Sequence, residues 1–157
     1  MIINTENKQV ISVLDGEEVV KTIKPKKVKI DTKDFKNLPI DKWNSVTVRE
    51  YIKYLNECRF GIPSVTFNVR QENAMICNFM KEYGKETTKA FIEACVKNYR
   101  PNPQYPTVNF ATMYSYMKAY ELPRVMKAKY EENRLEQLRA KAQATLNNQI
   151  NNIENYF

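Results

Sequence analysis

A proline-rich loop holds the residue types of this chain that are best suited to contact a ligand. Residues 99–106 read Tyr-Arg-Pro-Asn-Pro-Gln-Tyr-Pro, which places Tyr99, Arg100 and Tyr105 on one short, stiffened segment. Aromatic rings stack on exposed nucleic-acid bases, and neighbouring cations attract the phosphate backbone. The loop is therefore a candidate nucleic-acid contact. The alternative is a structural turn whose tyrosines pack inward.

Positively charged residues elsewhere in the chain would extend this candidate nucleic-acid contact. Residues 21–36 contain seven lysines and two aspartates, a net charge of +5 and the densest charge in the chain. This segment is a second candidate for phosphate contact; otherwise it is a solvated edge strand or arm. The complete set of predicted nucleic-acid-binding residues is Lys24, Lys26, Lys27, Lys29, Tyr99, Arg100, Tyr105, Lys118 and Arg124.

The overall charge is consistent with anionic partners. The 157 residues carry a formal charge of +7, and the pI is about 9.2, which favours nucleic acid or an acidic protein surface. Seven arginines stand against eighteen lysines. Lysine attracts phosphate as a point charge and does not read bases with two parallel hydrogen bonds. We therefore expect nucleic acid to be bound with low sequence specificity.

Catalytic chemistry has little support in the sequence. The chain has no histidine, and its carboxylates lie singly on helical faces that also carry lysines, as in solvated ion pairs. Three widely spaced cysteines and three glycines supply neither a zinc motif nor a phosphate-binding loop. We predict no catalytic residues, no metal and no cofactor, and hence a protein that is not an enzyme. A lysine or tyrosine acting in a pocket is the remaining enzymatic alternative.

Mainly helical elements are expected to position these residues. Two β-prone runs flank Asp15-Gly16, which predicts an N-terminal β-hairpin. Caps and breakers then predict four helices: one starting at Thr47, one from Asn68 to a left-handed cap at Gly84, one over 85–99 and one over 109–121.

A long C-terminal helix is expected after these four. Pro123 suits its first turn, and the 34 residues that follow contain no glycine or proline. Apolar residues recur there every three or four positions, and a small domain cannot cover the whole stripe. The predicted oligomer interface is Leu135, Leu138, Ala142, Leu146, Ile150 and Ile153. The spacing departs from strict heptads, which leaves dimer or higher order open.

Four segments carry a family resemblance: Gln71-Glu72-Asn73, then Phe79-Met80-Lys81-Glu82-Tyr83-Gly84, then Thr88-Lys89-Ala90-Phe91-Ile92-Glu93-Ala94, then Asn109-Phe110-Ala111-Thr112-Met113-Tyr114. In this order they resemble the C-terminal helical domain of the DnaD/DnaB primosome proteins, which phage replisome organisers and helicase loaders also carry. Where that family has Tyr-x-x-x-Ile-x-x-x-Trp, this chain has Phe110, Tyr114 and Lys118. The resemblance covers about a third of the chain. It implies DNA binding and contact with a replicative helicase or its loader, in a phage or a low-GC bacterium.

The sequence thus predicts a mainly α fold: a small helical domain with an N-terminal β-hairpin and a long C-terminal helix. The expected parts are a hairpin and basic arm over 1–39, a helical domain over 40–122 and an assembly helix over 123–157. The expected function is a non-enzymatic nucleic-acid-associated accessory factor of phage-type DNA replication, acting in helicase loading or in a primosome-like complex. The alternative is a protein–protein adaptor, such as a phage-type inhibitor or an assembly subunit, that uses the hairpin and the C-terminal helix.

The expected cellular location follows from the targeting and membrane motifs that the sequence lacks. It shows no signal peptide, lipidation motif or long apolar run. We therefore expect a cytoplasmic protein, in the host cytoplasm if viral, with no membrane partner. Another protein, bound through the C-terminal helix, and a second copy of the chain are the other expected partners.

Overall fold

The computed structural model describes residues 11–14, 17–20 and 30–154 and shows a mainly helical protein. The chain forms two compact units, Met1–Asp31 and Thr32–Phe157. In the first unit, strands β1 (Ile11–Leu14) and β2 (Glu17–Val20) pair antiparallel, with Ile11 opposite Val20. The predicted turn at Asp15-Gly16 and the lysines of 21–29 lie outside the described residues, so the complete hairpin stays a prediction.

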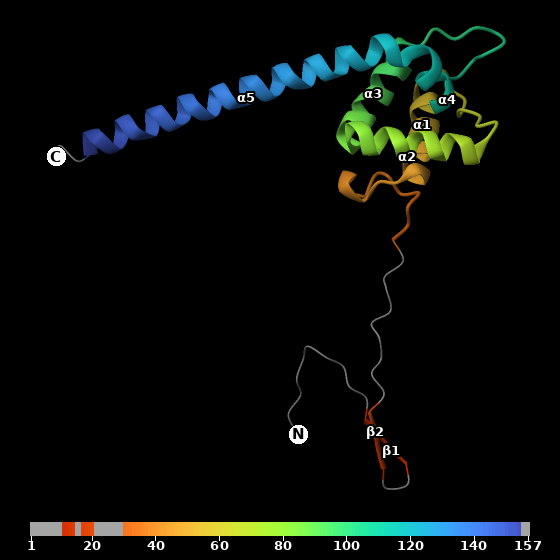
Figure 1. The fold of residues 1–157 in the computed structure, drawn as a ribbon, viewed down its shortest axis with the longest axis horizontal. Helices are drawn as coiled ribbons and strands as arrows, with labels where there is room; N and C mark the ends of the chain where they lie inside the picture. Colours follow the sequence, from red (N-terminus) through yellow and green to blue (C-terminus); the bar gives the residue numbers. More distant parts are fainter. Residues whose placement is uncertain (1–10, 15–16, 21–29, 155–157) are drawn as a thin grey trace. The chain divides into compact units, whose positions relative to one another are not determined.

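The second unit is helical. After the short 3₁₀ helix η1 (Ile40–Lys42), it contains α1 (Ser45–Phe60), α2 (Val69–Tyr83) and α3 (Lys85–Asn98). One continuous helical run then comprises α4 (Phe110–Thr112), the π-helical turn η2 (Met113–Met117) and α5 (Lys118–Glu154). Figure 1 shows α1–α4 gathered around the start of α5.

Aromatic packing joins these helices into one core. The rings of Phe79 and Phe91, from α2 and α3, stack with centroids 4.8 Å apart. Phe110 meets Phe79 edge to face at 5.7 Å. All three side chains are fully buried, and burying each one stabilises the fold by roughly 1.5–3 kcal/mol. Trp43 is also buried, and its indole nitrogen donates to the Leu38 carbonyl at 3.0 Å.

The helix ends agree with the sequence in part. The Asn68 side chain accepts a hydrogen bond from the Gln71 backbone N–H at 3.1 Å, which confirms the predicted cap of α2. The predicted start at Thr47 is wrong, since α1 begins at Ser45. Asn44 is the cap and Thr47 supplies the other half of the capping box. Asparagine is among the strongest N-cap residues, which explains why the helix starts earlier.

Gly84 departs from the predicted left-handed cap. Its φ of 84° is positive, as expected, but its ψ of 160° is extended. Such a conformation is essentially restricted to glycine. It lets the chain leave α2 and enter α3 at once, and the Thr88 hydroxyl donates to the Gly84 carbonyl at 2.7 Å.

The predicted helix start at Pro123 is also wrong, because Pro123 lies inside α5. Proline has no N–H, so the carbonyl four residues earlier, at Ala119, loses its helical partner. Ala119 is exposed, and water can bond that carbonyl. The two predicted C-terminal helices are therefore one continuous run. It contains a π-helical turn in which the Lys118 N–H donates to the Met113 carbonyl.

One buried asparagine fixes the chain where it returns from the proline-rich loop. The Asn56 amide donates to the carbonyls of Ile52 at 2.8 Å and Val108 at 3.0 Å, and its oxygen accepts the Val108 N–H at 2.9 Å. The Glu72 carboxylate accepts the Phe110 N–H at 2.9 Å. These contacts determine where the loop ends and α4 begins.

Asn56→Ala should therefore destabilise the fold by about 2–4 kcal/mol, because it leaves two buried backbone groups of Val108 without partners. Urea unfolding followed by circular dichroism measures the change. Asn78→Ala is the matched control, since Asn78 is exposed on α2, and it should change the stability by no more than about 0.5 kcal/mol. Equal effects of the two variants would contradict the anchoring role of Asn56.

Candidate functional site

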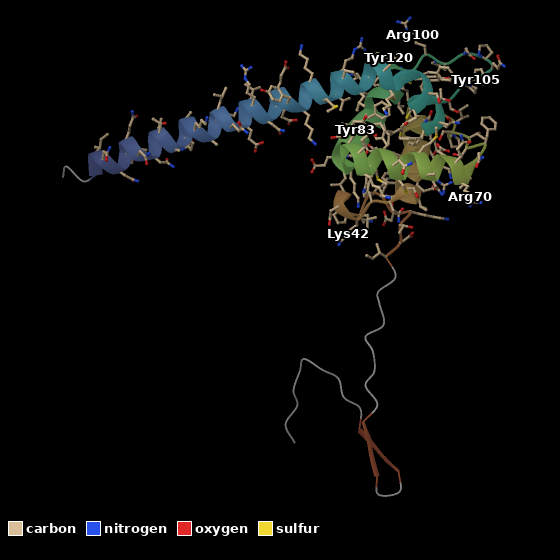
Figure 2. All side chains as sticks on the ribbon, in the orientation of Figure 1. Lys42, Arg70, Tyr83, Arg100, Tyr105 and Tyr120 are labelled. Carbon is tan, nitrogen blue, oxygen red and sulfur yellow. The ribbon has the colours of Figure 1, made fainter. Side chains whose placement is uncertain are left out.

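An open cavity of about 840 Å³ lies where the end of α3, the proline-rich loop and the start of α5 meet. Four of the residues predicted to bind nucleic acid line it: Tyr99, Arg100, Tyr105 and Arg124. Figure 2 shows Arg100, Tyr105 and Tyr120 at one end of the helical body and Lys42 at the opposite end. The fold thus gathers the loop residues and the start of α5 into one place.

Two further tyrosines, absent from the predicted set, line the same cavity. Tyr116 is 76% exposed and Tyr120 is 47% exposed, against 54% for Tyr105. The signal that would have found them is the spacing of four residues from Thr112 through Tyr116 and Tyr120 to Arg124. All four of these residues line the cavity.

The two loop tyrosines differ in their roles. Tyr99 is half-buried, and its hydroxyl donates to the Tyr105 carbonyl at 2.8 Å. Its ring meets Phe60 edge to face with centroids 6.0 Å apart. Burial, followed by the charge of neighbouring Tyr105, raises the pKa of Tyr99. Tyr99 therefore supports the loop, while Tyr105 offers an exposed ring.

Hydrogen bonds within the proline-rich loop fix its conformation. The Asn102 side-chain oxygen accepts the N–H groups of Gln104 at 3.0 Å and Tyr105 at 2.7 Å. The backbones of Asn102 and Tyr105 also exchange bonds of 3.1 and 3.2 Å. Asparagine favours this kind of local turn. The turn presents Tyr105 at the surface, so the alternative in which both loop tyrosines pack inward does not describe Tyr105.

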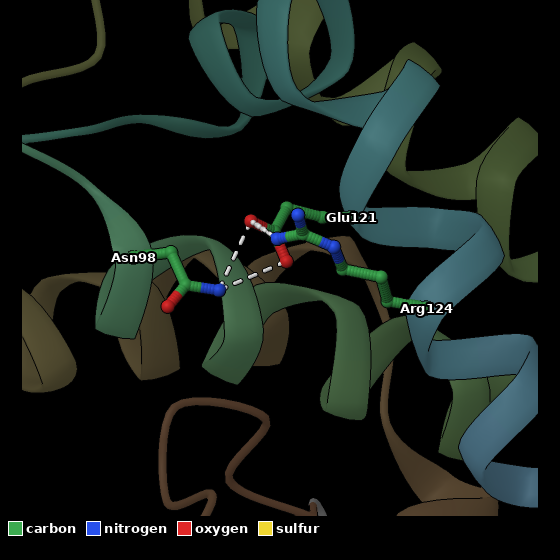
Figure 3. Close-up of polar contacts among 3 residues, drawn as sticks. All are labelled: Asn98, Glu121 and Arg124. Atoms are coloured by element: carbon green, nitrogen blue, oxygen red, sulfur yellow. Dashed lines mark hydrogen bonds and ion pairs between the residues drawn. The ribbon is translucent and has the colours of Figure 1, made fainter.

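A buried carboxylate joins the two sides of the cavity. Both oxygens of Glu121 accept from the Asn98 amide at 3.0 Å, and Arg124 Nη1 lies 3.5 Å from one of them (Figure 3). The Glu121 side chain is 2% exposed and that of Arg124 is 70% exposed. Asn98 ends α3 and Glu121 lies on α5, so these bonds fix the width of the cavity. They also hold the Arg124 guanidinium at its rim.

Lys118 lies apart from this group. Its ammonium is 4.6 Å from the ring centroid of Tyr114 and 5.3 Å from that of Tyr83. Such cation–π contacts stabilise a fold by about 0.5–2 kcal/mol. Lys118 does not line the cavity, so the structure does not bring it together with Arg100 and Arg124. Lys24, Lys26, Lys27 and Lys29 lie outside the described residues.

The predicted oligomer residues all lie on α5. Leu135, Leu138, Ala142, Leu146, Ile150 and Ile153 are exposed. Among residues 30–154 and the two short strands, no three cysteine, aspartate or glutamate side chains gather as a metal site would require. In the same part of the chain, no helix is both long and apolar enough to cross a membrane.

Comparisons with protein-family models, with curated proteins and with solved structures found no match for this chain.

Tyr99→Phe should lower the free energy of unfolding by about 1 kcal/mol, because the Tyr105 carbonyl loses the hydrogen bond from the Tyr99 hydroxyl. It should also speed proteolytic cleavage within 100–107. Tyr116→Phe is the matched control, and its loss of an exposed hydroxyl should change neither quantity. Urea unfolding and timed digestion measure the two effects. A loop that digests at the wild-type rate in Tyr99→Phe would show that this bond does not hold it.

Proposed function

We propose that this chain is a non-enzymatic nucleic-acid-associated accessory factor that binds a single strand through the tyrosine–arginine cavity. The observation that supports this most directly is the convergence of Arg100, Arg124, Tyr105, Tyr116 and Tyr120 on one opening. These residues come from a loop and a helix that are separate in the sequence.

The proposed binding mode follows from the chemistry of these side chains. Exposed phenol rings stack on unpaired bases, since every base has a π-face, and this stacking is tolerant of sequence. Arg100 and Arg124 lie at the same opening and attract the phosphates that accompany the bases. A duplex keeps its bases stacked on one another, so a single strand is the form that fits exposed rings.

The lysines of 21–36 would add a second contact under this proposal. Seven lysines precede the helical body within sixteen residues. A basic arm joined to the body raises the local concentration of cations near a bound polyanion. Such contacts carry no base preference, so the whole protein would bind many sequences with similar affinity.

The biological setting belongs to the same proposal. The resemblance of residues 71–120 to the DnaD/DnaB helical domain supports a role in phage-type DNA replication, in helicase loading or in a primosome-like complex. A replication fork exposes the single strands that the cavity would bind. The adaptor alternative has its own support in the exposed apolar residues of α5, such as Leu146 and Ile150.

Tyr116→Ala should weaken binding to a fluorescein-labelled oligo-dT strand by about tenfold, because stacking contributes ~1–3 kcal/mol per base. Fluorescence anisotropy titration measures the affinity. Tyr130→Ala is the matched control: Tyr130 is 69% exposed on α5 but does not line the cavity. Equal affinities for the two variants and the wild type would show that the cavity does not bind the strand.

Arg100→Ala should reduce the slope of log affinity against log salt concentration by about 0.7, the value for one phosphate contact on a single strand. The same titration is repeated at four salt concentrations. Lys42→Ala is the control, since Lys42 is exposed at the opposite end of the body (Figure 2). A slope that falls as much in Lys42→Ala as in Arg100→Ala would point to general charge and not to this site.

A further inference from the structure

A second, apolar groove lies beside the cavity. It has a volume of about 340 Å³ and is formed by the α1–α2 connection, the end of the proline-rich loop and the π-helical turn. Its walls include Ile62, Val65 and Phe67, and Phe67 is 86% exposed. Of the described residues that line this groove, none carries a charge. Exposed apolar surface of this kind marks an interaction site in a protein that is 27% charged.

The end of α5 has matching chemistry. Residues 142–153 contain no charged residue, although lysine and arginine are frequent just before them. Within this segment Leu146, Ile150 and Ile153 follow one another at i, i+4 and i+7, which places them on one helical face. This is the anchor spacing by which an amphipathic helix enters an apolar groove.

The periodicity of the stripe favours a groove over a coiled coil. From Leu135 to Ile153 the steps between stripe residues are 3, 4, 4, 4 and 3. A strict heptad seam alternates steps of three and four, so the three consecutive steps of four from Leu138 to Ile150 interrupt it. The stripe therefore departs from a continuous coiled-coil seam and suits a contact of a few helical turns.

The helix cannot reach the groove of its own chain. Lys129 of α5 still bonds to α3, through Thr87 and Glu86, and residues 130–153 are all exposed. Leu146 lies 17 residues further, about 25 Å along the axis at 1.5 Å per residue. No glycine or proline interrupts this stretch, so the helix does not turn back.

We propose that the charge-free end of α5, anchored by Leu146, Ile150 and Ile153, docks in the Ile62–Val65–Phe67 groove of a second copy of this chain. Two copies that exchange helices make the contact twice, which closes the assembly as a dimer. The proposal concerns self-association only and does not depend on nucleic-acid binding.

The test compares two charge-introducing variants of the full chain by sedimentation velocity after nuclease treatment. The wild type should dimerise. Ile150→Asp on the helix and Val65→Asp in the groove should each raise the dimer dissociation constant at least tenfold. Asn148→Asp, on the opposite face of α5, and Asn78→Asp, on α2, add the same charge and should leave it unchanged.

Mixing the two variants separates this contact from symmetric pairing of two α5 helices. The intact helix of Val65→Asp can dock in the intact groove of Ile150→Asp, so the mixture should form dimers more readily than either variant alone. This rescue also shows that both variants are folded. The proposal would be overturned by a monomeric wild type or by either variant associating as the wild type does. It would also be overturned by a mixture that forms dimers no more readily than each variant alone.

Discussion

The hydrogen bonds that the buried Glu121 carboxylate accepts from Asn98 are the constraint on which the cavity depends. A carboxylate removed from water is costly unless it is bonded, and here both of its oxygens accept from one amide at 3.0 Å. Because Asn98 immediately precedes Tyr99 and Arg100, the same contact that holds α5 against α3 also determines where the loop leaves the body. Arg124, one turn beyond Glu121, is positioned by the same carboxylate.

The π-helical turn at Met113–Met117 is the second determinant of the surface. It follows the cap of α4 by Asn109 and precedes α5 without a break. Met113 and Met117 are buried, while Tyr116 between them is exposed. The two methionines of the turn therefore anchor the helical run in the core, and Tyr116 faces outward between the cavity and the groove. Turns of this type recur at functional sites, and this one borders both openings.

Local sequence signals predicted the elements well and their junctions poorly. Asn68 and the break at Gly84 mark α2, and Pro101 follows the end of α3, because caps and breakers act within a few residues. The start of α1 differs from the prediction because the Asn44 side chain caps the N–H groups of Val46 and Thr47, so the helix begins earlier. Pro123 predicts a helix start, but tertiary packing of Leu122 and Met117 stabilises a helix that passes through it.

By itself the sequence determined the helical class, the net positive charge and the uninterrupted, apolar-striped C-terminal helix, because each of these follows from composition or short-range periodicity. Only the tertiary structure decided which rings lie at the surface and which cations share an opening with them. Tyr99 and Tyr105 look alike in the sequence, yet one packs on Phe60 and the other is exposed. Lys118 and Arg124 lie six residues apart on one helical run but face different neighbours. The reason is that a side chain's surroundings depend on elements far away in the chain, which no local pattern records.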